Sequence, residues 1–211
     1  MTDWGEFQAD LAYEQYQEEQ YLEQVAEEGV DAFSRERLQA YYRENPNVAE
    51  KSLNALRTAE ILVDVSASAS LVFAAVSLEL TIKNVILRPL VHGLVHNEAL
   101  AGFVAQYAVG RRGTKWFDRL LQPLLRELAD VDLSTYRREG QSVTLWEEVL
   151  RVTKFRNDVL HDGEAATSDQ ATTALDASAT LLRTVFPAVV QALELTIDEE
   201  LRIGDGEARP E

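Results

Sequence analysis

The chain contains no cysteine, so disulfide bonds and thiolate chemistry are excluded from its fold and its function. Proline and glycine are scarce, with 5 and 10 residues among 211, and they cluster between segments of helical periodicity. Because these two residues are the strongest interrupters of helices, their scarcity predicts an all-α protein. With only three histidines, the chain offers few imidazoles for acid–base catalysis.

The sequence also lacks several signatures of known activities and locations. We find no internal repeat, no glycine-rich phosphate loop, no Walker-type lysine and no Ser-His-Asp arrangement. The N-terminus is acidic and has no basic region followed by an apolar stretch, and no run reaches the roughly 20 apolar residues that span a bilayer. We therefore expect a cytoplasmic protein.

Basic residues are few, and the charge is distributed unevenly. The net charge is −16, which is unusual for a protein that binds RNA. Residues 1–50 carry 13 acidic and 3 basic side chains, whereas the remaining 161 residues carry 23 and 17. We expect an acidic helical extension over residues 1–45, a helical bundle over 46–203 and a disordered tail over 204–211.

The segment 154–163, Lys-Phe-Arg-Asn-Asp-Val-Leu-His-Asp-Gly, departs from the pattern around it. A helix is predicted to begin after Thr144, which forms a capping box with Glu147, and to stop at Gly163. Its apolar residues form one broad arc on a helical wheel: Leu145, Trp146, Val149, Leu150, Val152, Val159 and Leu160.

Arg156 lies near the middle of this arc, Asn157 inside its edge and His161 just beyond it. Because a charge on a core-facing surface is unfavourable, the three polar residues indicate either a functional site or simple capping of the helix C-terminus. Asn157 and His161 are four apart and share a face, and the helix dipole at this end favours a protonated imidazole.

The run Arg156-Asn157-Asp158-Val159-Leu160-His161 resembles the Arg-polar-x-x-x-His motif of the HEPN superfamily of all-helical proteins. Residues 77–84, Ser-Leu-Glu-Leu-Thr-Ile-Lys-Asn, are similar to an early helix of that family, where an acidic residue and a lysine follow an apolar run. A long Ala-rich helix follows the motif, again as in the family. The resemblance covers about residues 48–195 and implies a HEPN-like helical bundle.

The resemblance implies an endoribonuclease that needs no metal or cofactor, often a toxin or antiviral-defence effector with a partner such as an antitoxin. The 2′-hydroxyl of the RNA would be the nucleophile, and His161 would act in acid–base catalysis. Arg156 would hold the phosphate and Asn157 would orient it. The supporting residues would be Glu79, Lys83, Asn84 and Asp158. Two protomers would share the site as a homodimer.

One position departs from the family and leaves alternatives open. Some family toxins carry a tyrosine two residues after the histidine, where an antitoxin modifies it, but this chain has Gly163 there. Other family members do not cleave RNA, so a non-catalytic module that binds a nucleotide or a protein is the alternative, and a helical scaffold with an acidic arm is a third.

Two further segments carry candidate residues. The loop 110–116 is the most basic patch, and Arg111, Arg112, Lys115 and Trp116 suit phosphate contact and base stacking, or else form a loop with a buried tryptophan anchor. His92 and His96 have the i, i+4 spacing of a zinc site, with Glu98 nearby. Gly93, the preceding Pro89 and the lack of cysteine favour a surface turn instead.

Several helix boundaries can also be predicted. We expect helices over about 4–28, 31–43, 47–65, 71–87, 97–109 and 116–128, with Pro89 ending the fourth. Residues 66–70 are small and polar and indicate either a break or a closely packed helical turn. The last helix should be capped by Thr167 or Ser168, bend at Pro187 and continue to about residue 201.

Overall fold

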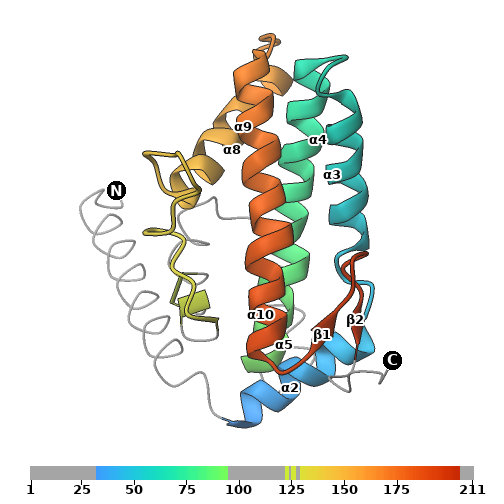
Figure 1. Ribbon diagram of the computed structural model, residues 1–211. Helices are drawn as coiled ribbons and strands as arrows, with labels where there is room; N and C mark the ends of the chain where they lie inside the picture. Colours follow the sequence, from blue (N-terminus) through green and yellow to red (C-terminus); the bar gives the residue numbers. More distant parts are fainter. Residues whose placement is uncertain (1–31, 95–121, 124, 127–128, 205–211) are drawn as a thin grey trace, which may run out of the picture.

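In a computed structural model, described for residues 32–94, 122, 123, 125, 126 and 129–204, the chain is mostly helical (Figure 1). This confirms the all-α prediction. The elements are α2 Ala32–Glu44, α3 Glu50–Leu62, α4 Ala67–Leu80, η1 Thr81–Leu87, α5 Arg88–Leu94, α8 Leu145–His161, α9 Ser168–Thr180, η2 Leu181–Val185, α10 Phe186–Ala192, β1 Thr196–Ile197 and β2 Ile203–Gly204. The two strands form one small antiparallel ladder.

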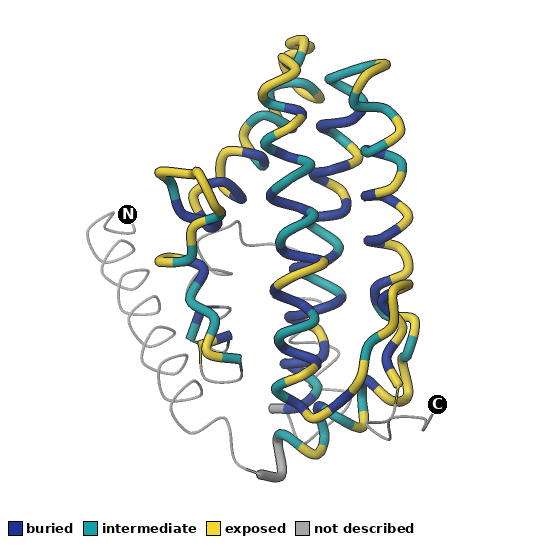
Figure 2. Tube along the Cα trace, viewed as in Figure 1, coloured by how far each residue is buried: buried dark blue, intermediate teal, exposed yellow. Residues whose placement is uncertain are grey.

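Two long helical rods form the centre of the bundle. One is α4 with η1 and α5, and the other is α9 with η2 and α10; α3 and α8 pack against this pair (Figure 1). The sides of these helices that face one another are buried (Figure 2). Alanines let the rods approach closely, since Ala74, Ala171, Ala174 and Ala177 are all fully buried.

Pro89 does not end its helix, so that prediction is wrong. The residues before it widen into the π-helical turn η1, in which the N–H of Arg88 donates to the carbonyl of Lys83, five residues back. A proline lacks an N–H and its ring clashes with the carbonyl four residues earlier, here Val85. The Tyr42 hydroxyl donates to the Val85 carbonyl at 2.8 Å, so this acceptor has a hydrogen bond although Pro89 has no N–H to offer it.

Pro187 is accommodated in the same way. The π-helical turn η2 precedes it, and the N–H of Phe186 donates to the carbonyl of Leu181. The helix then ends at Ala192, not near residue 201, so the predicted end is wrong. Glu194 takes a left-handed backbone conformation with φ of 57°, which stops the helix, and the chain turns back as the β1–β2 hairpin.

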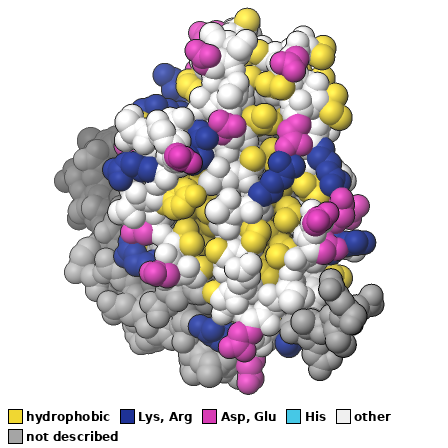
Figure 3. Space-filling view, in the orientation of Figure 1, with side chains coloured by type: hydrophobic (Ala, Val, Ile, Leu, Met, Phe, Trp, Pro, Cys, Tyr) yellow, Lys and Arg dark blue, Asp and Glu magenta, His cyan; other side chains and the backbone are white. Residues whose placement is uncertain are grey.

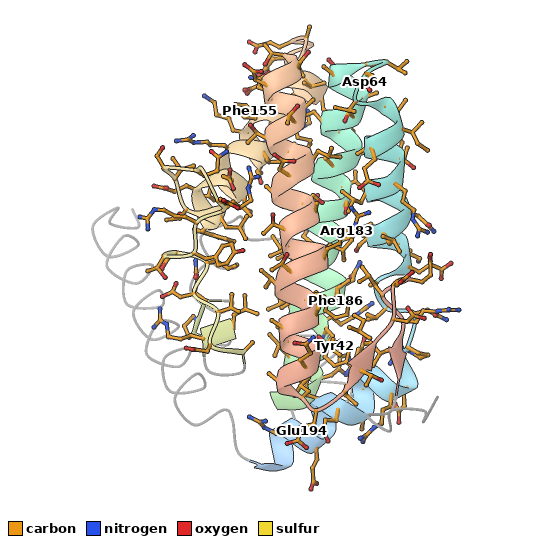
Figure 4. All side chains as sticks on the ribbon, in the orientation of Figure 1. Tyr42, Asp64, Phe155, Arg183, Phe186 and Glu194 are labelled. Atoms are coloured by element: carbon orange, nitrogen blue, oxygen red, sulfur yellow. The ribbon has the colours of Figure 1, made fainter. Side chains whose placement is uncertain are left out.

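The hairpin and α2 close one end of the bundle. Tyr42 of α2 is completely buried and packs against Phe186 (Figure 4). Arg35 and Gln39 donate to the carbonyls of Ala192 and Leu193 at 2.9 and 2.8 Å, where the last turn of α10 leaves acceptors unpaired. Residues 32–44 therefore pack into the body, although they belong to the predicted acidic extension; residues 1–31 lie outside the described chain.

The α4 helix carries apolar side chains around its circumference, with Glu79 as its one charged residue. Ser66 caps α4 by accepting a hydrogen bond from the Ala69 N–H. The helical path is therefore interrupted before Ser66, and residues 67–70 form the first turn of α4. By length and composition alone, the helix Ala67–Gly93 could cross a membrane, although Glu79 and Lys83 divide it into shorter apolar runs. In this fold 61% of its most apolar 18-residue stretch is buried, as expected for the core helix of a bundle.

Candidate functional site

The motif helix α8 begins and ends as the sequence predicts. The Thr144 hydroxyl accepts a hydrogen bond from the Glu147 N–H, and the Glu147 carboxylate accepts one from the Thr144 N–H, which completes the capping box. At the other end, Gly163 has a φ of 70°, a conformation that strains other residues. The α9 helix starts with a second capping box, between Thr167 and Gln170.

The arc predicted for the core on α8 is only partly buried. Leu145, Trp146, Val149 and Val152 lie in the core, but Leu150 and Leu160 are exposed by 40% and 53%, so their predicted burial is wrong. Glu148 is buried in their place. Burial therefore follows the first half of the helix, while the second half, which carries the motif, reaches the surface.

Arg156 contacts segment 77–84, the second segment in the family resemblance. Its guanidinium Nη2 lies 3.4 Å from Oε2 of Glu79 on α4, and the other carboxylate oxygen of Glu79 pairs with the Lys83 ammonium group. The Arg156 side chain is 29% exposed. One carboxylate thus bridges two cations, and it joins the two segments on which the family resemblance rests. Lys83 and Asn84 lie in η1 and are half-buried.

Arg138, by comparison, is held far more tightly. It donates two hydrogen bonds of 2.8 and 2.7 Å to Glu148 and a third of 3.1 Å to Asp176, and its side chain is only 14% exposed. These bonds raise the pKa of its guanidinium further. Arg138 therefore anchors the loop before α8 to α8 and α9 and leaves little of its charge for an outside ligand. Among the described residues, Arg156 has one long contact, to Glu79, and its side chain is more exposed.

His161 and Asn157 are exposed at the C-terminal end of α8. The carbonyl of half-buried Asp158 accepts hydrogen bonds from the N–H groups of Asp162 and Glu164, which folds the end of the helix around that carbonyl. Carboxylates at positions 158, 162 and 164 therefore lie within one turn of His161 along the chain. The arrangement offers an accessible imidazole in acidic surroundings.

The fold leaves an apolar surface beside the motif that the sequence analysis did not identify. Ser70 and Ser77 donate to carbonyls of α3, and Glu79 points toward α8, so both neighbours of α4 on this side are accounted for. Phe73 lies one turn from Ser70 and Ser77, and Val76 lies one turn before Glu79, so both are on the side of α4 between these two neighbours, where each is 39% exposed. A helix that is apolar on every side requires cover on every side, which was the available signal in the sequence.

The other predicted binding residues are not tested by these contacts. Arg111, Arg112, Lys115 and Trp116 lie outside the described residues, as do His96 and Glu98 of the alternative zinc site. His92 is half-buried and stacks on the Tyr41 ring with centroids 5.0 Å apart. Within residues 32–94 and the described part of 122–204, no group of three His, Asp or Glu side chains is placed to hold a metal.

The cleft that the described residues form lies away from the motif. Basic and acidic side chains alternate over the described face in Figure 3. A polar cleft of about 340 Å³ lies between α3 and the hairpin, and none of its lining residues comes from α8. Its arginines are already paired, Arg57 with Glu200 and Arg202 with Asp198, each at 2.8 Å. We therefore place the candidate site on α8 and α4, where the motif lies.

Comparison of the chain with protein-family models, with curated proteins and with solved structures gave no match in any of the three.

Proposed function

We propose that the protein is a metal-independent endoribonuclease of the HEPN type, a cytoplasmic toxin or defence effector with a HEPN-like bundle. The observation that carries the proposal is the weak pairing and partial exposure of the Arg156 side chain. This arginine lies on the core side of α8, yet within the described part of the chain it has one long contact, to Glu79, and it remains partly exposed. Arg138, which anchors the loop before α8, instead has short bonds to both carboxylate oxygens of Glu148.

The residues divide the chemistry between them. Arg156 binds the scissile phosphate and stabilises the charge that grows on its oxygens. The 2′-hydroxyl oxygen attacks phosphorus and the bond from phosphorus to the 5′-oxygen breaks, giving a 2′,3′-cyclic phosphate and a 5′-hydroxyl. His161 transfers a proton in this step, and Asn157, on the same exposed side, orients the phosphate. Lys83, Asn84 and Asp158 support this arrangement.

The reaction moves two protons, one from the 2′-hydroxyl and one to the leaving oxygen, and each chain offers one motif histidine. A homodimer that pairs two motif helices supplies both. The exposed apolar side chains Phe73 and Val76 on α4 and Leu160 on α8 provide a surface for this contact. Leu160 is four residues after Arg156 and therefore on the same side of α8.

The activity is tested with the purified full chain on tRNA and total RNA, with and without EDTA. We expect cleavage in both conditions and 2′,3′-cyclic phosphate ends. His161→Ala and Arg156→Ala should abolish cleavage with unchanged melting, because both side chains are at least partly exposed. Arg151→Ala is the matched control, since Arg151 is an exposed arginine of the same helix. Equal cleavage by wild type and His161→Ala would refute the assignment.

The homodimer is tested separately by light scattering at micromolar concentration. We expect a dimer for the wild type and a monomer with reduced cleavage for Val76→Glu, because a charge in an apolar contact is costly. A fully active wild-type monomer would contradict the shared site. Ile61→Glu is the control, because this residue is 75% exposed on α3, away from the motif.

The acidic surroundings of His161 favour a second candidate, a non-catalytic module that binds a nucleotide or a partner protein such as an antitoxin. Asp158, Asp162 and Glu164 repel a polyanion, and no continuous basic surface appears among the described side chains in Figure 3. In this case no RNA would be cleaved under any condition, and the Arg156→Ala change would weaken binding of the nucleotide or partner.

A further inference from the structure

Glu79 occupies the position that an anion would take between Lys83 and Arg156. Its two carboxylate oxygens face different cations, Lys83 through Oε1 and Arg156 through Oε2. The three side chains come from α4, η1 and α8, and all are partly exposed, by 41% for Glu79 and 25% for Lys83. A phosphate oxygen has the same charge and accepts the same hydrogen bonds as a carboxylate oxygen.

The two contacts of Glu79 are unequal. The Lys83 pair is i, i+4 on one helical segment, in the favourable order with the acidic residue first. The Arg156 contact joins two helices and is 3.4 Å long, whereas charge-assisted hydrogen bonds are usually about 2.7–2.9 Å. The bond to Arg156 is therefore the one that an incoming anion breaks first, and Glu79 keeps a partner when it does.

We propose that Glu79 is a resident anion that competes with a substrate phosphate for Arg156 and so sets the affinity of the site for RNA. This inference rests on the proposed function and identifies a specificity-determining residue for it. With Glu79 ionised, the group formed with Lys83 and Arg156 has a net charge of +1. Without that carboxylate the net charge is +2, and the guanidinium is unoccupied by any described side chain.

The proposed competition predicts the direction in which RNA affinity changes when the charge of Glu79 is removed. If Glu79 served to orient Arg156 for the substrate, removing its charge would weaken RNA binding. If it competes, removing its charge strengthens binding. A single charge at about 4 Å from a partly exposed site contributes on the order of 1 kcal/mol, which corresponds to about a fivefold change in Kd.

The test measures binding, separately from cleavage, with a 2′-O-methyl RNA oligonucleotide that lacks the attacking hydroxyl. For Glu79→Gln we expect a Kd about fivefold lower at low salt. We also expect the logarithm of the binding constant to fall more steeply with salt, by about 0.7 for one additional phosphate contact to a single strand. The double variant Glu79→Gln/Arg156→Ala should lose this gain.

Glu60→Gln is the matched control. Glu60 pairs with Arg183 at 2.6 Å, also between two helical elements, so the same change is made at an ion pair away from the motif. Its effect on Kd should stay below about twofold, which separates the local effect from the general loss of one negative charge. Glu79→Asp is a second variant, because the shorter side chain withdraws the charge from Arg156, and it should lie between wild type and Glu79→Gln.

The outcomes separate this inference from the proposed function. Tighter binding by Glu79→Gln supports the resident anion, even if neither protein cleaves RNA and the nuclease assignment fails. Equal or weaker binding by Glu79→Gln overturns the inference, even if the wild type cleaves RNA. The absence of binding by wild type and both Glu79 variants also overturns it. A gain of the same size in Glu60→Gln would show a general charge effect and overturn it too.

Discussion

Breaking the ion pair between Arg138 and Glu148 from one side should be among the more destabilising single changes in this fold. The Glu148 side chain is 1% exposed, and Arg138 bonds both of its carboxylate oxygens. The change Glu148→Gln removes the negative charge and leaves a poorly hydrated guanidinium with only the longer bond to half-exposed Asp176. Removing one partner of a buried pair costs about 3–5 kcal/mol, and because Asp176 remains we expect about 3 kcal/mol.

The assay is urea unfolding followed by circular dichroism, with thermal melting as a check. A loss of about 3 kcal/mol corresponds to a Tm lower by roughly 6–12 °C in a chain of this size. Glu60→Gln is the control, since its pair with Arg183 is similarly short but has side chains exposed by 35% and 44%, and should lose below about 1 kcal/mol. Equal losses in the two variants would refute the argument from burial. The double change Arg138→Met/Glu148→Leu should recover part of the loss, because no unpaired charge then remains.

Three further predictions concern the fold and the acidic arm. Tyr42→Phe removes the donor to the Val85 carbonyl and should cost about 1–3 kcal/mol in urea unfolding, and a change below 0.5 kcal/mol would show that this carbonyl finds another donor. The hydrogen bond from the Thr144 N–H lowers the pKa of Glu147 below its usual value of 4.5, so its stabilising effect is present above pH 4.5 and is lost as pH falls through the lower folded-state value. Glu147→Gln should therefore flatten the stability curve on that acid side, and an unchanged curve would contradict the capping argument. Residues 1–31 carry ten acidic and no basic side chains, so we expect this segment to compete with RNA phosphates for cationic side chains. Deleting it, which spares Leu38 and Tyr42 of the core, should therefore raise RNA affinity, and more at low salt than at high salt, because exposed charges are screened within about 10 Å at 0.1 M. Unchanged binding with an intact melting transition would rule out this competition.

Local sequence alone determined where α8 and α9 begin. Both capping boxes, at Thr144 and Thr167, involve residues only three positions apart, so no distant contact is needed to form them. The end of α8 at Gly163 is equally local, because a left-handed residue stops a helix wherever it occurs. The all-α class follows from the same kind of information, repeated along the chain.

The effect of the prolines depended on tertiary structure. Pro89 and Pro187 both have the local properties of helix breakers, but each lies inside a rod that is buried on several sides. Packing then favours a continuous helix with a widened turn, and for Pro89 the Tyr42 hydroxyl, 43 residues away from Val85 in the chain, supplies the missing donor. No pattern around position 89 contains that information.

The candidate site shows the same division. The sequence identified Arg156 as misplaced on an apolar arc and paired Glu79 with Lys83 by their spacing. Only the packing of α8 against α4 brought Glu79 to Arg156. Only the position of the loop before α8 determined that Arg138 pairs with Glu148, while Arg156 stays accessible. Spacing along a helix fixes which side chains share a face, but the partner across an interface is fixed by how whole helices pack.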